Sequence, residues 1–250
     1  MAKRNSAVRC AFCGGRGPFT AEHVFPEWAA RLVGAGRFAV RSARLNEPVR
    51  RWQAVRSFGF TVRDVCQSCN NEWMSELETL AMPILQPMIR PVGSVTLDAD
   101  QQLVLACWLS KVAILHEYAA TRRYFRVADR ASLLRRGAPP PGVQIWIGAY
   151  VGSRTGTLWG GPCTFAGGRP PQHVPGLLTT LNLGQFAAQL LAHRLRDSMR
   201  VRGQYDFSRL VLRIWPPLVE RVTWPPAAGG LDDEAFSALH RRWNTPLLRP

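Results

Sequence analysis

The chain has 250 residues, enough for one large domain or two small ones. Hydrophobic residues make up 46% and charged residues 20%, close to globular proteins, and no apolar run approaches the ~18 residues of a membrane helix. A net charge of +15 favours a polyanionic partner such as nucleic acid, although the charge can also serve solubility alone. The basic N-terminus lacks an apolar segment, so we expect no secretory signal and a soluble, cytoplasmic protein.

In the first part of the chain, the pattern predicts two half-buried strands and one helix. Apolar and basic residues alternate over residues 38–41 and 52–56, as they do in strands with one buried face. Residues 70–80 repeat apolar side chains at helical spacing, so we expect a helix there. Pro83 and Pro87 follow, and we expect them to interrupt the helix.

In the second part, helical and strand patterns are mixed. Helical spacing of apolar residues predicts helices over 103–120, 183–199 and 232–243. Residues 143–151 and 210–215 alternate like strands. The chain is therefore expected to have an α+β fold.

The polar motifs are concentrated in the first 90 residues of the chain. Residues 1–90 hold both C-x-x-C pairs and the other candidate site residues, so we expect a metal-stabilised N-terminal domain there. Residues 91–250 carry no comparable constellation. We expect them to form a mixed α/β domain that serves substrate or partner choice.

Two C-x-x-C pairs are the most specific motif in the sequence. Zinc prefers four soft ligands in a tetrahedron, and each pair offers two thiolates from one tight turn. The alternatives are a redox C-x-x-C or four unrelated thiols. We expect one structural zinc ion bound by Cys10, Cys13, Cys66 and Cys69. The two remaining cysteines, Cys107 and Cys163, have apolar neighbours and are expected to be buried.

Two further polar motifs flank the cysteine pairs. Glu22 and His23 are followed by Val-Phe-Pro, which places both polar groups at the edge of a short strand. An isolated histidine of this kind is more often structural than functional. Asn70 directly follows the second cysteine pair, where it can cap the next helix or serve as a ligand to a hard metal.

The order C-x-x-C, E-H-V-F-P, C-x-x-C-N within residues 10–80 resembles the zinc-containing branch of the HNH nucleases, which have the ββα-metal fold. The run C-N-N-x-W-M-x-x-L-E is also similar to bacterial HNH proteins with a C-terminal extension. The resemblance implies an N-terminal ββα-metal unit and a metal-dependent endonuclease that hydrolyses phosphodiester bonds in nucleic acid, with DNA as the expected substrate.

The resemblance also assigns roles to individual residues. It implies that His23 is the general base that activates water, and that Glu22 and Asn70 bind one catalytic Mg²⁺ or Mn²⁺ ion. The sequence departs from the family at two positions. Thr61 stands where the family usually has an asparagine that holds its loop, and Trp73 stands where it has a basic residue.

The segment between the cysteine pairs is rich in arginine. Its arginines can contact phosphate groups, or they can line the solvated face of a hairpin. The candidates for nucleic-acid contacts are Arg41, Arg44, Arg50, Arg51 and Arg56. The alternative function to a nuclease is a zinc-stabilised protein that binds nucleic acid without cleaving it, or an HNH-like scaffold adapted to another substrate.

Overall fold

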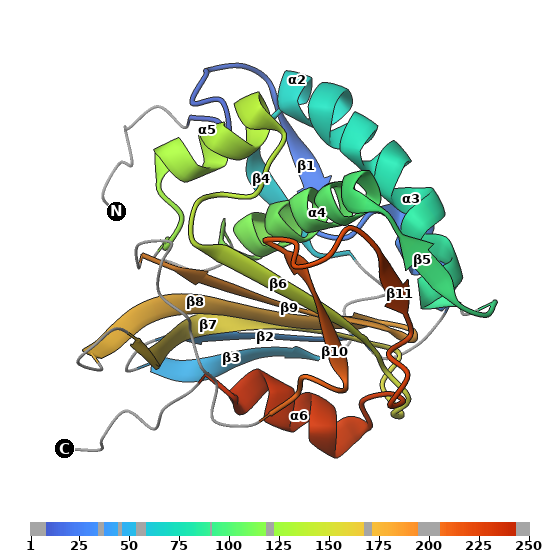
Figure 1. Cartoon of the computed structure of the whole chain (residues 1–250). Coiled ribbons are helices and arrows are strands. Elements are labelled where there is room, and N and C mark those ends of the chain that lie inside the picture. The colour runs from blue at the N-terminus through green and yellow to red at the C-terminus, as the bar shows by residue number, and fades with distance from the viewer. Residues whose placement is uncertain are drawn as a thin grey trace.

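A computed structural model describes residues 9–34, 38–44, 47–53, 59–90, 92–118, 123–167, 172–194 and 206–243. The expected mixture of helices and strands is confirmed (Figure 1). The strands are β1 (Phe19–His23), β2 (Phe38–Arg44), β3 (Glu47–Gln53), β4 (Thr61–Cys66), β5 (Val95–Leu97), β6 (Val143–Ala149), β7 (Gly156–Gly167), β8 (Gln172–Leu183), β9 (Phe186–His193), β10 (Val211–Trp215) and β11 (Val222–Trp224). The helices are α1 (Glu27–Val33), α2 (Gln67–Cys69), the π-turn η1 (Asn70–Met74), α3 (Ser75–Ile89), α4 (Ala99–Tyr118), α5 (Val127–Arg136) and α6 (Asp233–Arg241).

A seven-stranded sheet with the order β10-β6-β9-β8-β7-β2-β3 forms the centre of the fold. Neighbouring strands are antiparallel except β2 and β7, which run parallel. Two short antiparallel pairs, β1 with β4 and β5 with β11, lie outside this sheet. Since β2 and β3 come from the first 90 residues and the other strands from the last 160, both parts of the chain build one sheet.

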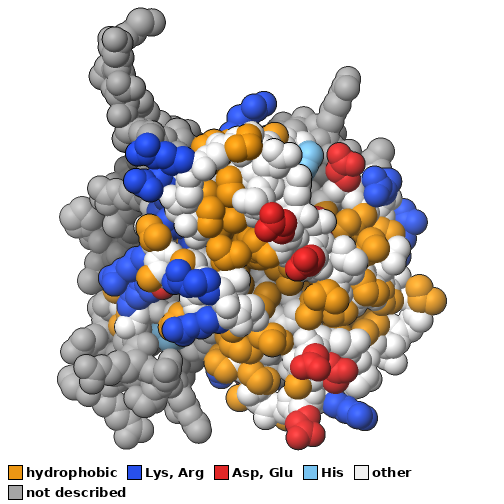
Figure 2. Space-filling model, turned by 90° about the horizontal axis from the view of Figure 1, so that it is seen from above, with side chains coloured by type: hydrophobic (Ala, Val, Ile, Leu, Met, Phe, Trp, Pro, Cys, Tyr) orange, Lys and Arg blue, Asp and Glu red, His pale blue; other side chains and the backbone are white. Residues whose placement is uncertain are grey.

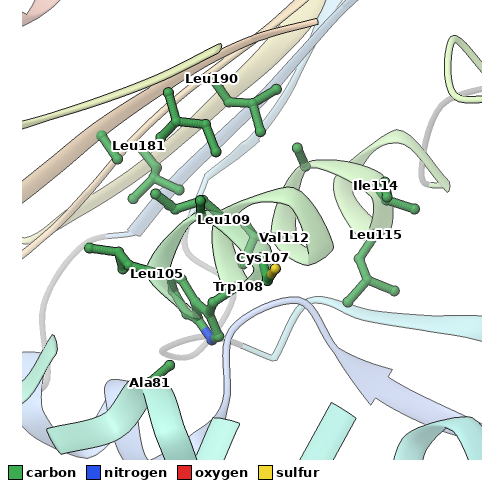
Figure 3. Close-up of a cluster of buried hydrophobic side chains, with 14 of the residues drawn as sticks. Ala81, Leu105, Cys107, Trp108, Leu109, Val112, Ile114, Leu115, Leu181 and Leu190 are labelled. Carbon is green, nitrogen blue, oxygen red and sulfur yellow. The ribbon is translucent and has the colours of Figure 1, made fainter. Parts of the chain in front are cut away.

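The two faces of the sheet are covered differently. Helices α3 and α4 lie over one face and α6 lies against the other (Figure 1). In Figure 3, Leu109 of α4 points toward Leu181 and Leu190 on the sheet, while Trp108 lies toward Ala81 of α3. Most of α4 is therefore buried on all sides, as expected for a helix with apolar residues around its circumference.

One hydrophobic core joins the two parts of the chain. It runs from Phe12 beside the first cysteine pair, through α3 and α4, to Trp224 in β11. Elements on both sides of the predicted boundary at residue 90 contribute to this core, and the division into domains 1–90 and 91–250 stays a prediction.

Most of the expected elements are confirmed within a few residues. The strand over 38–41 lies within β2, and the strands over 143–151 and 210–215 correspond to β6 and β10. The helices over 103–120 and 232–243 correspond to α4 and α6. Residues 52 and 53 end β3, whereas residues 54–56 of that predicted strand lie outside the described residues.

The expectation that Pro83 and Pro87 interrupt the first long helix is wrong. Helical structure continues from Gln67 to Ile89 through α2, η1 and α3, with both prolines inside α3. Each proline removes one backbone hydrogen bond. The buried α3 residues around them pack against α1 and α4, which offsets that loss: Ala81, Ile84, Leu85, Met88 and Ile89.

The predicted helix over 183–199 is also wrong for residues 183–194, the part of this range that the structure describes. Residues 186–193 form strand β9, which is joined to β8 by a tight turn with Gly184 at φ +52°. Every side chain of β9 is buried, because helices cover both faces of the sheet. A strand that is buried on both faces has no polar alternation, so its sequence cannot be distinguished from a buried helix by periodicity. Residues 195–199 lie outside the described part of the chain.

Candidate metal centre

The four predicted cysteine ligands come together. Cys10 and Cys13 lie in a turn before β1, while Cys66 ends β4 and Cys69 lies in the following helical turn. The antiparallel pairing of β1 with β4 makes Phe19 the partner of Cys66, which brings the two turns side by side.

The geometry of this cluster fits a tetrahedral metal. All four sulfur atoms lie within 4.8 Å of one another, and the Sγ atoms of Cys13 and Cys66 are 3.6 Å apart. Four ligands at the usual Zn–S distance of ~2.3 Å are separated by about 3.8 Å from one another. The four cysteines can therefore hold one metal ion such as zinc.

Hydrogen-bond donors near the cluster stabilise the thiolate form of its cysteines. The backbone N–H of Gly15 donates to Sγ of Cys13 over 3.3 Å, and that of Cys66 donates to Sγ of Cys10 over 3.4 Å. Burial opposes ionisation of Cys66, but hydrogen bonds from the Ser68 side chain, from the backbone of Cys69 and from neighbouring thiols lower its pKa to about 6. Burial raises the pKa of Cys69. The hydrogen bonds around Cys66 therefore favour its thiolate form.

The first cysteine turn is fixed from two directions. Phe12 is fully buried and meets the ring of Trp73 edge to face, with centroids 5.1 Å apart. Trp73, at a position where the resemblance expects a basic residue, therefore supports the turn. From the other direction, the buried Arg130 of α5 donates to the carbonyl oxygen of Ala11. Residues far apart in sequence hold the turn in place.

One side of the cluster is open to solvent. An open groove of about 470 Å³ adjoins Cys13, which is exposed, while Cys10, Cys66 and Cys69 are buried. Arg16 and Asn71 contribute to its walls. A chelator in solution could therefore approach a metal held by these cysteines from this side.

Glu22, His23 and Asn70 lie outside the four-cysteine cluster. Among the described residues, the four cysteines form the only group of three or more His, Cys, Asp or Glu side chains close enough to share an ion. The Asn70 side-chain N–H donates to Oγ1 of Thr20 over 2.9 Å. His23 is half-buried at the end of β1, with Thr61 as its cross-strand partner. Because successive strand residues point to opposite faces, Glu22 and His23 diverge.

Glu22 faces a lysine instead. Its carboxylate, only 5% exposed, accepts a hydrogen bond from Nζ of Lys111 over 3.0 Å. The same Nζ donates to Glu78 of α3. Burial raises the pKa of Glu22, an effect that the ammonium of Lys111 opposes. This Glu22–Lys111–Glu78 cluster does not fit a divalent ion at Glu22, because the ammonium occupies the space beside the carboxylate.

Lys111 and Glu78 were not predicted as site residues from the sequence. A signal was present, because Lys111 is a single charged residue in the middle of an apolar helix. A buried lysine is rare without a partner of opposite charge. The sequence does not indicate, however, which of the 17 acidic residues that partner is.

Four of the predicted nucleic-acid contacts lie on the hairpin formed by β2 and β3. Arg41 is the direct cross-strand partner of Arg51, Ser42 is that of Arg50, and Arg44 ends β2. Arg56 lies outside the described residues. β3 is the edge strand of the sheet, so this hairpin is at the margin of the fold. On the face that carries the helices, hydrophobic groups spread across the middle and basic groups gather mainly along one side (Figure 2).

The described residues thus contain a cluster of four cysteines and a buried ion pair between Glu22 and Lys111. Four cysteine ligands complete the coordination of zinc and leave no position for a reacting water molecule, so the cluster suits a structural metal. None of the helices in the described residues has the length and apolar character needed to cross a membrane. Comparisons with protein-family models, curated proteins and solved structures give no match for this chain.

Proposed function

We propose that this protein binds nucleic acid through the β2–β3 hairpin and that a structural zinc ion stabilises the unit from which the hairpin extends. The main support for this proposal is the register of the hairpin. It makes Arg41 and Arg51 direct cross-strand partners at the edge of the sheet. Arginine is a common ligand of phosphate groups in proteins that bind nucleic acid. The net charge of +15 also attracts polyanions from a distance.

Removal of this arginine pair tests the proposal. The double variant Arg41→Gln/Arg51→Gln should bind DNA more weakly, with the slope of log affinity against log salt reduced by up to ~2, at ~0.9 for each phosphate contact on duplex DNA. The measurement is fluorescence anisotropy of a labelled duplex at several salt concentrations. Single-stranded DNA and RNA probes of equal length show which form of nucleic acid is preferred.

A matched control removes the same charge elsewhere. Arg135 and Arg136 are exposed at the end of α5, so Arg135→Gln/Arg136→Gln lowers the net charge equally without changing the hairpin. This control should keep the salt slope of the unaltered protein. Equal slopes for both double variants would contradict a binding site on the hairpin.

A metal-dependent HNH endonuclease is the second candidate. It is favoured by the order of elements, because β1 with Glu22 and His23 pairs with β4, and the helical run with Asn70 follows directly. The hydrogen bond from Asn70 to Thr20 also joins the start of that run to β1. In this function, His23 takes a proton from the water molecule that attacks phosphorus.

Plasmid nicking separates the two candidates. If the protein is a nuclease, His23→Ala should lower the cleavage rate by ~10²–10⁴-fold and leave DNA affinity nearly unchanged. The assay compares the unaltered protein with His23→Ala across a titration of Mg²⁺ and Mn²⁺, and anisotropy supplies the affinity. DNA binding without cleavage under all these conditions favours the first candidate. Cleavage that depends on His23 favours the second.

A further inference from the structure

The carboxylate of Glu22 is enclosed by protein. Only 5% of the residue is exposed, and Lys111 beside it is completely buried in the middle of α4. The Glu22 side chain therefore faces the core between β1 and α4. A phosphodiester group of a nucleic acid is too bulky to reach a carboxylate that is covered in this way.

The ammonium group of Lys111 occupies the position that a shared cation would take. Its Nζ lies 3.0 Å from Glu22 Oε1 and also donates to Glu78. Two carboxylates that converge on one point are typical ligands of a hard divalent ion. Here they converge on a lysine that comes from the second part of the chain.

The lysine is not easily displaced. The acidic groups that contact Lys111 in the described residues are Glu22 and Glu78, and Nζ has no exposure to solvent. If a divalent ion took both carboxylates, the ammonium would remain buried without a partner of opposite charge, which is strongly unfavourable. An ion from solution therefore competes poorly with a partner that is covalently part of the chain.

We infer that Lys111 permanently replaces the divalent cation that the HNH resemblance assigns to Glu22, so that Glu22 is a partner of lysine and not a metal ligand. In this respect the unit differs from a metal-dependent nuclease. Cation binding is measured in the absence of nucleic acid, so its result is independent of whether the protein binds DNA.

Mn²⁺ binding to the full, zinc-loaded chain tests the inference. Electron paramagnetic resonance reports free Mn²⁺, and zinc gives no signal. The unaltered protein and Glu22→Gln should bind the same amount of Mn²⁺, because Glu22 offers no free position. A Mn²⁺ site in the unaltered protein that Glu22→Gln removes would overturn the inference.

A gain of binding provides the second test. Lys111→Ser removes the ammonium, leaves space and adds a hydroxyl oxygen, while the partly exposed Glu78 gives solvent access from one side. This variant should gain one Mn²⁺ site, and Lys111→Ser/Glu22→Gln should lose it again. If a folded Lys111→Ser variant gains no site, the lysine does not fill a cation position. If Lys111→Ser does not fold, the comparison with Glu22→Gln decides the question.

Discussion

Replacement of Cys66 by serine should release the zinc ion and unfold the segment that contains β1 and β4. A structural zinc ion contributes an apparent ~10–16 kcal/mol at neutral pH, comparable to the whole ~5–15 kcal/mol stability of a typical domain. Cys66 lies within 4.8 Å of the other three thiols, so its loss opens the coordination sphere. Zinc content by elemental analysis and the midpoint of urea unfolding measure the two effects.

Cys107→Ser is the matched control for this substitution. Cys107 is also buried, but its thiol donates to the carbonyl oxygen of Gly137 over 3.2 Å and lies outside the cluster. Burial raises its pKa to about 12, so it is a neutral thiol that a hydroxyl group can replace. This variant should keep its zinc. A Cys66→Ser protein that retains one zinc ion per chain and an unchanged midpoint would rule out the four-cysteine site.

Lys111→Met should lower the free energy of unfolding by about 3–5 kcal/mol, the usual cost of breaking a buried ion pair from one side. Methionine fills the space of the lysine side chain but leaves Glu22 and Glu78 facing each other without a cation. Lys111→Met/Glu22→Gln removes one of the two charges and should recover much of the loss. Urea unfolding of both variants at neutral pH gives the comparison.

The effect of Lys111→Met should depend on pH. Without the ammonium, burial raises the pKa of Glu22 further, so the folded state binds a proton more tightly than the unfolded state. Stability then falls as the pH rises through the raised pKa of the folded state. The variant should be closer to the unaltered protein at pH 5 than at pH 8. Glu76→Gln on the exposed side of α3 should change little at either pH. If Lys111→Met/Glu22→Gln is less stable than Lys111→Met, the loss of stability does not come from the uncompensated charge of Glu22.

Local patterns in the sequence were sufficient to predict the four-cysteine cluster and several elements. The spacing within each C-x-x-C pair places two sulfur atoms on one turn, so the four ligands are recognisable without knowledge of the fold. The helix over α4 and the strand β6 also follow from periodicity within a short window. In both cases, the residues that determine the structure are neighbours in sequence.

Contacts between distant residues could not be predicted in this way. The pairing of Lys111 with Glu22 joins residues 89 positions apart, and no local pattern identifies one partner from the other. Strand β9 lacks alternation because α4 and α6 cover it from both sides. The helix through Pro83 likewise depends on packing against neighbouring elements, which offsets a lost hydrogen bond.

The parallel pairing of β2 with β7 has a consequence for folding during synthesis. Phe38 pairs with Gly156, so β2 leaves the ribosome more than a hundred residues before its partner, a delay of roughly 10 s at about 5–20 residues per second. Cys10 and Cys13 emerge before β2, and Cys66 and Cys69 emerge before β7, so zinc can bind while the β2–β3 hairpin still lacks the rest of its sheet. Exposed strand edges promote association between chains, and charged residues oppose it. The arginines of the hairpin are therefore expected to oppose association between nascent chains before β7 is synthesised.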